Sequence, residues 1–237
     1  MTNVDLQSPI NIPYRIRRSD RARHARIVVD ESGVEVVVPR RMALRHVEPF
    51  VAEKQRWIER TLQRYESVRA EAPRVVLADG GSVPYLGEQL ELDVRVEPGR
   101  VRPHVARLAD RLVVKVGRSG RAAVGDALER WYRKRAREEV AMRLDYATAR
   151  AGTGWTRLSI RGQRTRWASC SQDGAMSFNW RLLLAPAEIL DYVVEHEVAH
   201  LEVLDHSDRF WRLLARRAPD YREHERWLRR NGHTLTL

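Results

Sequence analysis

The segment from His196 to His206, HEVAHLEVLDH, constrains the local fold more than any other part of the chain. On an α-helix, residues four positions apart lie about 40° apart around the axis and roughly 6 Å along it, so His196 and His200 project from one face. Two imidazoles in this relation can bind one metal ion. Glu197 lies about 100° round the helix from His196, where its carboxylate can approach a metal-bound water without displacing it.

A third histidine, His206, lies beyond the expected end of this helix. If the chain turns back there, three imidazoles bind the ion and a fourth position stays open, which favours zinc. With eight histidines and 19 glutamates in 237 residues, chance gives about 0.02 copies of the HExxH pattern, and about 0.0007 with the third histidine. The segment therefore predicts one zinc per chain, with Glu197 as general base and acid in a hydrolysis, most naturally of a peptide bond.

The rest of the sequence alternates between strand and helix patterns, which predicts an α+β fold. In the first half of the chain we expect strands within 12–40, one long helix from Pro49 to about Arg69, and short strands within 74–117. A long helix from about Asp126 to Gly152 and a β region over 155–184 should follow. The last expected elements are a helix from Pro186 through the histidine segment and helices over 209–217 and 221–230. Ser207 stands where its side chain can cap the first of the last two helices. We expect a β-rich N-terminal region with one long helix over 10–118 and a catalytic domain over 121–237.

Composition excludes several classes of protein. Apolar residues make up 43% of the chain, which suffices for a core, and no apolar run approaches the roughly 18 residues of a membrane helix. The N-terminal residues lack the basic start and apolar stretch of a secretory signal. The single cysteine, Cys170, excludes an intramolecular disulfide. We therefore expect a soluble, cytoplasmic protein, and the sequence gives no indication of its oligomeric state.

The net charge of +11 depends almost wholly on arginine, and six arginines fall within 15–26. This stretch could bind phosphate groups, but a solvated strand edge explains it as well. No nucleic-acid recognition motif accompanies the charge, so we expect only weak, salt-sensitive binding of nucleic acid or another polyanion.

Several stretches resemble the YgjP-like metallopeptidase domain, a zincin family related to the SprT-like and WLM metalloproteases. The resemblance spans 14–237, is most specific after Arg161, and is carried by the segments RWASCS at 166–171, FNWRL at 178–182, LDYVV at 190–194 and PDYR at 219–222. It implies a zincin-like metallopeptidase domain in which His196, His200 and His206 bind zinc and Glu197 is the catalytic acid and base. Val203 stands where better-known metzincins have a turn-forming glycine.

Some alternatives stay open at the level of sequence. Glu223, His224 and Glu225 lie on the last expected helix and could return to the site, where a glutamate could replace His206 as third ligand. Tyr221 could donate to an oxyanion, and Cys170 could face the metal cleft. The strand within 171–180 could bind an extended substrate at a sheet edge. The substrate could also be a nucleotide or another phosphate ester, or the chain could be a polyanion-binding module with a structural metal. Glu197 argues against the last, because a structural site needs no general base.

Overall fold

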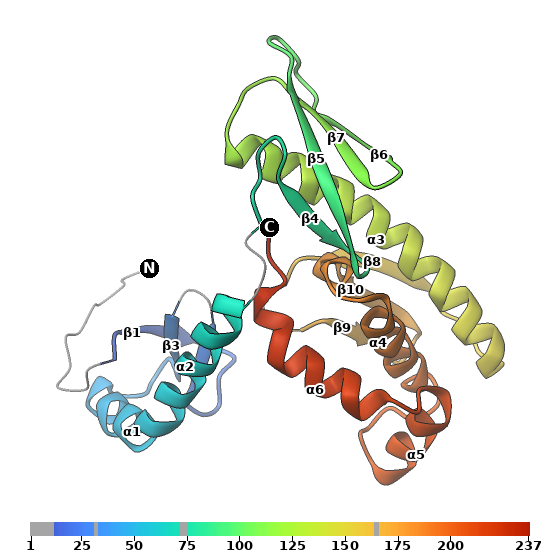
Figure 1. The fold of residues 1–237 in the computed structure, drawn as a ribbon. Helices are drawn as coiled ribbons and strands as arrows, with labels where there is room; N and C mark the ends of the chain where they lie inside the picture. Colours follow the sequence, from blue (N-terminus) through green and yellow to red (C-terminus); the bar gives the residue numbers. More distant parts are fainter. Residues whose placement is uncertain (1–11, 31–32, 72–74, 164–165) are drawn as a thin grey trace. The chain divides into compact units, whose positions relative to one another are not determined.

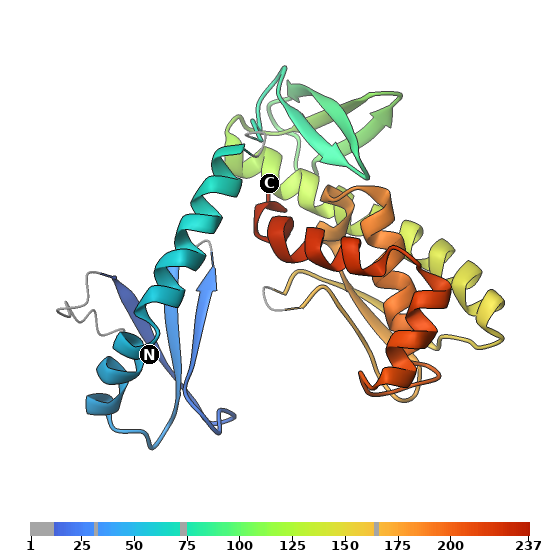
Figure 2. The same ribbon diagram turned by 60° about the horizontal axis from the view of Figure 1, so that its bottom comes forward.

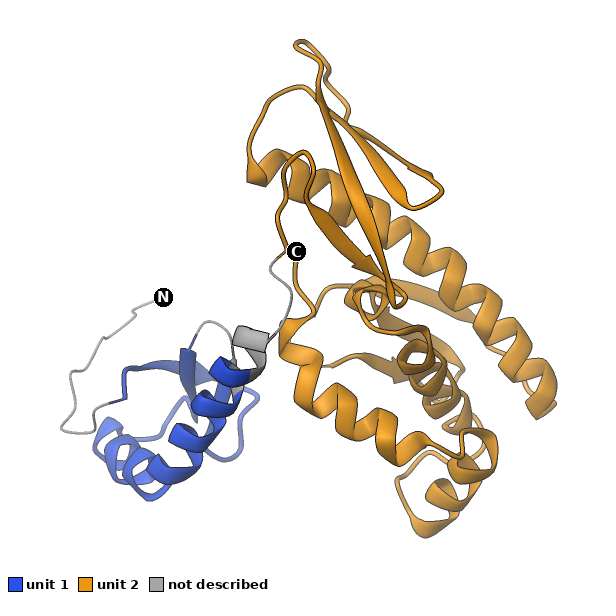
Figure 3. Ribbon diagram, viewed as in Figure 1, with its two compact units in different colours: residues 1–72 blue, residues 73–237 orange. Residues whose placement is uncertain are grey.

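The computed structural model describes residues 12–30, 33–71, 75–163 and 166–237. The chain forms two compact units, 1–72 and 73–237 (Figure 3). The first contains a small mixed α/β core, and the second contains the histidine segment. The α+β fold expected from the sequence is confirmed.

The N-terminal unit is a three-stranded sheet with helices on one face. Its elements are β1 (Tyr14–Ser19), β2 (Arg26–Asp30), β3 (Gly33–Pro39), a short 3₁₀ helix η1 (Leu44–His46), α1 (Val47–Glu53) and α2 (Gln55–Glu71). The strand order is β1-β3-β2, with β3 parallel to β1 and antiparallel to β2. Alternate apolar residues of β3 pack with the helices in a core that includes Val36, Val38, Val51 and Ile58. The single helix expected here is two helices, because the chain leaves helical geometry at Lys54 (φ −99°, ψ 3°).

The second unit begins with a four-stranded sheet that packs on a long helix. The elements are β4 (Ser82–Tyr85), β5 (Glu88–Val96), β6 (His104–Leu108), β7 (Arg111–Val116) and α3 (Arg121–Ala151). The strand order is β4-β5-β7-β6, and Figures 1 and 2 show the sheet along the N-terminal half of α3. α3 starts five residues before the expected Asp126, because burial of Val124 and Leu128 outweighs the low helix propensity of Gly125.

The remaining elements surround the histidine segment. They are β8 (Arg157–Arg161), β9 (Ala168–Cys170), β10 (Ala175–Asn179), a 3₁₀ helix η2 (Trp180–Leu184), α4 (Ala187–Ala199), α5 (Asp208–Arg217), α6 (Tyr221–Asn231) and the 3₁₀ turn η3 (Gly232–Thr234). The strand order is β8-β10-β9, so β10 is central and the short β9 is an edge. The end of the expected β region, 180–184, is helical. α4 contacts α3 on one side and β9, α5 and α6 on others (Figure 1).

One continuous core joins both sheets of the second unit. α3 contributes Leu128, Tyr132 and Leu144 to it, and α4 contributes Leu190 and Val198. The expected domain division near residues 118–121 therefore does not coincide with the compact units, because β4–β7 and β8–β10 share α3. No helix in the described part of the chain is both long and apolar enough to span a membrane.

Candidate metal centre

The end of α4 and the segment that follows it place three histidines. The helix buries an apolar face that includes Leu190, Val194 and Val198, which fixes its rotation and leaves His196 in its last turn. His200 is the C-terminal cap residue of α4. His206 follows in the connection to α5 and is exposed.

The three imidazoles converge. One ring nitrogen from each of His196, His200 and His206 lies within 4.8 Å of the other two, and among the described residues this is the one His, Cys, Asp and Glu group of its kind. The Nε2 atoms of His196 and His206 are 3.1 Å apart. Two ligands of a tetrahedral zinc, each about 2.0–2.1 Å from the ion, lie roughly 3.3 Å apart. The donor set and its spacing therefore fit a zinc ion.

Protonation also favours metal binding. Burial, and then the charges of His200 and His206, lowers the pKa of His196 to about 3, and burial lowers the pKa of His200. Nδ1 of His200 donates to the carbonyl oxygen of Val203 at 3.1 Å, which leaves the lone pair on Nε2. Neutral imidazoles are the form that a metal requires.

Aromatic rings of α5 pack against the histidines. Phe210 is fully buried and stacks on His200, with ring centroids 4.5 Å apart and planes at 26°. It also meets His196 edge to face at 4.9 Å, and the ring of Trp211 lies 5.6 Å from that of His206. These contacts fix the ring orientations from the side of α5.

The turn towards His206 forms without a glycine. The N–H of Val203 donates to the carbonyl of Ala199 at 3.0 Å, and Val203 is not among the described residues with positive φ. The carboxylate of Asp205 accepts the N–H of Ser207 at 3.1 Å. Ser207 is the N-cap of α5, but its side chain forms no capping hydrogen bond. The helix cap expected from the Ser207 hydroxyl is therefore absent. The side chain and the backbone N–H of Ser207 both form hydrogen bonds with the Asp205 carboxylate instead.

Glu197 is a buried carboxyl beside the histidines. It is 6% exposed, and its Oε2 has no hydrogen-bond partner among the residues that the structure describes. Burial raises its pKa to about 7, while a hydrogen bond from the backbone N–H of Cys170 and the charge of Arg166 act to lower it. A carboxyl with a pKa near neutrality can both take and return a proton. The sequence alone does not reveal that Arg166 and the Cys170 N–H act on the Glu197 carboxyl, because neither residue is near Glu197 in the chain.

The sheet edge beside the site is β9, not the strand within 171–180. The N–H of Ser171 donates to Ala175, and the N–H of Asn179 donates to the carbonyl of Trp167. Residues alternate along a strand, so Ala168 and Cys170 direct their backbone groups away from β10. Burial, then the charges of Glu197 and Asp173, raises the pKa of the Cys170 thiol to about 11, so this thiol is a weak nucleophile.

The other residues considered from the sequence lie outside the histidine group. Glu223 is exposed on α6. Tyr221 is buried, stacks on Trp211 with centroids 5.7 Å apart, and its hydroxyl accepts a hydrogen bond from Nε of Arg222 at 3.0 Å.

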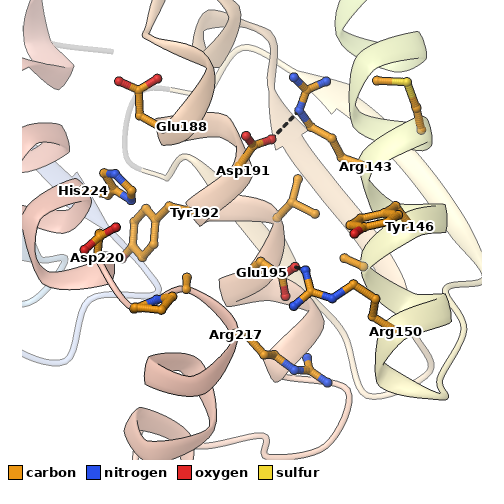
Figure 4. A pocket seen from close by; sticks show the side chains of 15 residues that line it. Arg143, Tyr146, Arg150, Glu188, Asp191, Tyr192, Glu195, Arg217, Asp220 and His224 are labelled. Carbon is orange, nitrogen blue, oxygen red and sulfur yellow. Dashed lines mark hydrogen bonds and ion pairs between the residues drawn. The ribbon is translucent and has the colours of Figure 1, made fainter.

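A separate cavity of about 650 Å³ lies among α3, α4 and the α5–α6 connection (Figure 4). Its charged side chains pair between α3 and α4: Arg143 with Asp191 at 2.6 Å, and Arg150 with Glu195 at 3.4 Å. Tyr192 projects towards its rim near His224 (Figure 4), with ring centroids 6.0 Å apart, and also contacts His196 at 6.0 Å. These pairs join α4 to α3 and support the helix that carries His196.

An α+β fold with convergent imidazoles at a helix end and a buried carboxyl beside them is typical of a metal-dependent hydrolase. A comparison with known protein families matches residues 23–231 to the family described as YgjP-like, metallopeptidase domain. The chain belongs to this family, which confirms the resemblance seen in the sequence. Membership implies a hydrolase that uses a divalent metal, typically zinc, and a peptide or protein substrate. No curated protein and no solved structure matches the chain.

Proposed function

We propose that the protein is a zinc-dependent peptidase in which His196, His200 and His206 hold one zinc ion and Glu197 is the general base and acid. The convergence of three imidazole nitrogens within 4.8 Å carries this proposal. The Oε2 of Glu197 is buried and finds no hydrogen-bond partner in the described part of the chain, which supports a reactive site over a structural one.

Held by His196, His200 and His206, a zinc ion would supply a Lewis acid that lowers the pKa of water from about 15.7 towards about 7. Glu197 takes a proton from the attacking water and then passes it to the leaving amine. Its raised pKa suits both transfers, because the protonated carboxyl forms readily in between. The outward backbone groups of Ala168 and the outward carbonyl of Cys170 on β9 pair with an extended peptide and orient its scissile bond. The N–H of Cys170 is engaged with Glu197 and takes no part in this pairing.

The test is a screen of the purified, zinc-loaded protein against peptides, proteins and nucleotides. Glu197→Gln should keep the zinc and lose about 10²–10⁴-fold in activity, because an amide cannot accept the water proton. Glu188→Gln, at the exposed first turn of the same helix, is the matched control and should keep full activity. Peptidase activity of Glu197→Gln within a few-fold of wild type would refute the role of Glu197, and hydrolysis of nucleotides alone would refute the peptidase.

Elemental analysis tests the ligands separately. His200→Ala and His206→Ala should each reduce the zinc content well below one ion per chain. Release of zinc by Glu223→Ala, with retention in His206→Ala, would place the third ligand on α6 instead.

A further inference from the structure

A second cavity, of about 700 Å³, lies between α5 and α6. Trp211 forms part of its wall, and the ring of Trp211 also lies 5.6 Å from that of His206. The cavity and the histidine group therefore share Trp211. A peptide whose scissile bond lies at the histidines can place a neighbouring side chain here.

The wall formed by α6 is basic. Arg222, Arg226 and Arg229 line the cavity, and all three are exposed. Arg229 pairs with Glu225 at 2.7 Å. Among the described residues, Arg222 and Arg226 have no ion-pair partner, although they lie one helical turn apart. Two like charges at this spacing destabilise a helix, and an anion bound between them relieves that repulsion.

Both guanidinium groups are held through one nitrogen. Nε of Arg222 donates to the Tyr221 hydroxyl at 3.0 Å, and Nε of Arg226 donates to the carbonyl of Arg222 at 3.1 Å. Within the described part of the chain, only the Nε atoms of these two arginines form hydrogen bonds, and their terminal nitrogens form none. The terminal nitrogens of an arginine can bind a carboxylate through two parallel hydrogen bonds.

The rest of the cavity can hold the apolar stem of a substrate side chain that ends in a carboxylate. Trp211 and Tyr221 stack on each other with planes at 22° and give one aromatic wall. Asp208, at the start of α5, is the other acidic residue of the lining besides the paired Glu225. An anion is therefore favoured on the α6 side of the cavity and disfavoured near Asp208.

We propose that this cavity is a substrate subsite that selects an acidic side chain, Asp or Glu, close to the scissile bond, with Arg222 and Arg226 binding its carboxylate. This inference rests on the proposed peptidase function.

The test uses a peptide that the wild-type protein cleaves, with Glu or Gln placed in turn at each position flanking the cleaved bond. At one position, Glu should raise kcat/KM about tenfold over Gln, as one additional charge-assisted contact allows. In the Arg222→Gln/Arg226→Gln variant this ratio should fall close to one. Arg212→Gln removes an exposed arginine of α5 outside the cavity and should keep the ratio. Absence of a preference, its survival in the double variant, or an equal fall in Arg212→Gln would overturn the proposal.

Binding gives a second readout that does not depend on catalysis. Fluorescence anisotropy of labelled Glu and Gln peptides on zinc-loaded Glu197→Gln should show the same preference, lost on Arg222→Gln/Arg226→Gln. If no peptide is hydrolysed but this selective binding is found, the peptidase function fails and the acidic subsite stands. If peptides are hydrolysed and both bind equally, the subsite fails alone. Inorganic phosphate could displace the labelled peptides while the protein shows no preference for Glu over Gln. That result would show that the two arginines bind phosphate and would overturn the proposed binding of a carboxylate side chain.

Discussion

Burial of the Glu197 carboxyl costs the folded protein stability whenever the carboxyl is ionised. Burial raises the pKa of this group from 4.5 to about 7, so the folded chain holds the proton more tightly than the unfolded chain does. The unfolded carboxyl ionises near pH 4.5 and the folded one near pH 7. The contribution of Glu197 to the free energy of unfolding therefore falls as the pH rises through this window. The same burial gives a general base its reactivity, so stability and chemistry conflict at this residue.

We therefore expect metal-free Glu197→Gln to be more stable than metal-free wild type at pH 8, by about 1–3 kcal/mol. The amide keeps the volume of the side chain and removes the buried charge. At pH 5 the wild-type carboxyl is largely protonated when folded, and the difference should shrink. Urea unfolding in the presence of a chelator measures both values, with Glu188→Gln as control. A difference of equal size at the two pH values would contradict the burial of an ionised Glu197.

At the scale of elements, the sequence predicts those whose pattern is local. The helix that carries His196 follows from its apolar periodicity, although it ends at Ala199 and His200 is its cap residue. The helices α5 and α6 lie within a residue of their expected bounds. The sequence predicts strands within 12–40, and β2 and β3 pair there as antiparallel neighbours, from Arg26 opposite Val37 to Asp30 opposite Gly33. Residues 31–32, between these two strands, lie outside the described part of the chain. The convergence of His206 with the other two histidines also agrees with the sequence, because a short connection and a following helix leave little freedom.

Features that depend on distant contacts could not be predicted in this way. The central place of β10 is set by parallel pairing with β8 and antiparallel pairing with β9, and the alternation of apolar residues within one strand does not reveal its neighbours. The approach of the Cys170 N–H to Glu197 follows from that topology. The helix break at Lys54 likewise depends on packing, since 47–71 has no internal residue that stops a helix after Pro49.

The connection from α4 to α5 gives a prediction at the same scale. Asp205→Ala should weaken zinc binding, by roughly up to tenfold, because the carboxylate that orders the backbone beside His206 is lost. Ser207→Ala should weaken zinc binding less than Asp205→Ala does. It removes only the hydroxyl that bonds to the Asp205 carboxylate and keeps the backbone N–H that the carboxylate accepts. Competition with a chelator measures both affinities. The opposite ranking of the two variants would show that the serine hydroxyl, and not the aspartate, holds the turn.

At the scale of the whole molecule, the buried apolar side chains of the described residues form two separate hydrophobic cores. The core of the N-terminal unit draws on residues between Ile12 and Leu62, and the core around the histidines draws on residues from Val75 to Leu237. Each cluster is thus built from one unit alone. The four-stranded sheet before α3 belongs with the histidine core, because Leu112 and Val114 pack in the same cluster as Leu128.

Residues 73–237 should therefore fold as an independent protein and bind one zinc with an affinity within a few-fold of that of the full chain. All the proposed ligands and the core around them lie within this segment, and its length is that of an ordinary single domain of about 100–200 residues. Circular dichroism on heating should show one cooperative transition, and elemental analysis one zinc per chain. A cut at residue 120 gives the matched control, since it removes Leu112, Val114 and the rest of the first sheet from the core. We expect that shorter fragment to unfold at a lower temperature or to aggregate. Normal stability and zinc content in the shorter fragment, together with failure of 73–237, would contradict the division at Ala72 and Pro73 and favour a boundary next to α3.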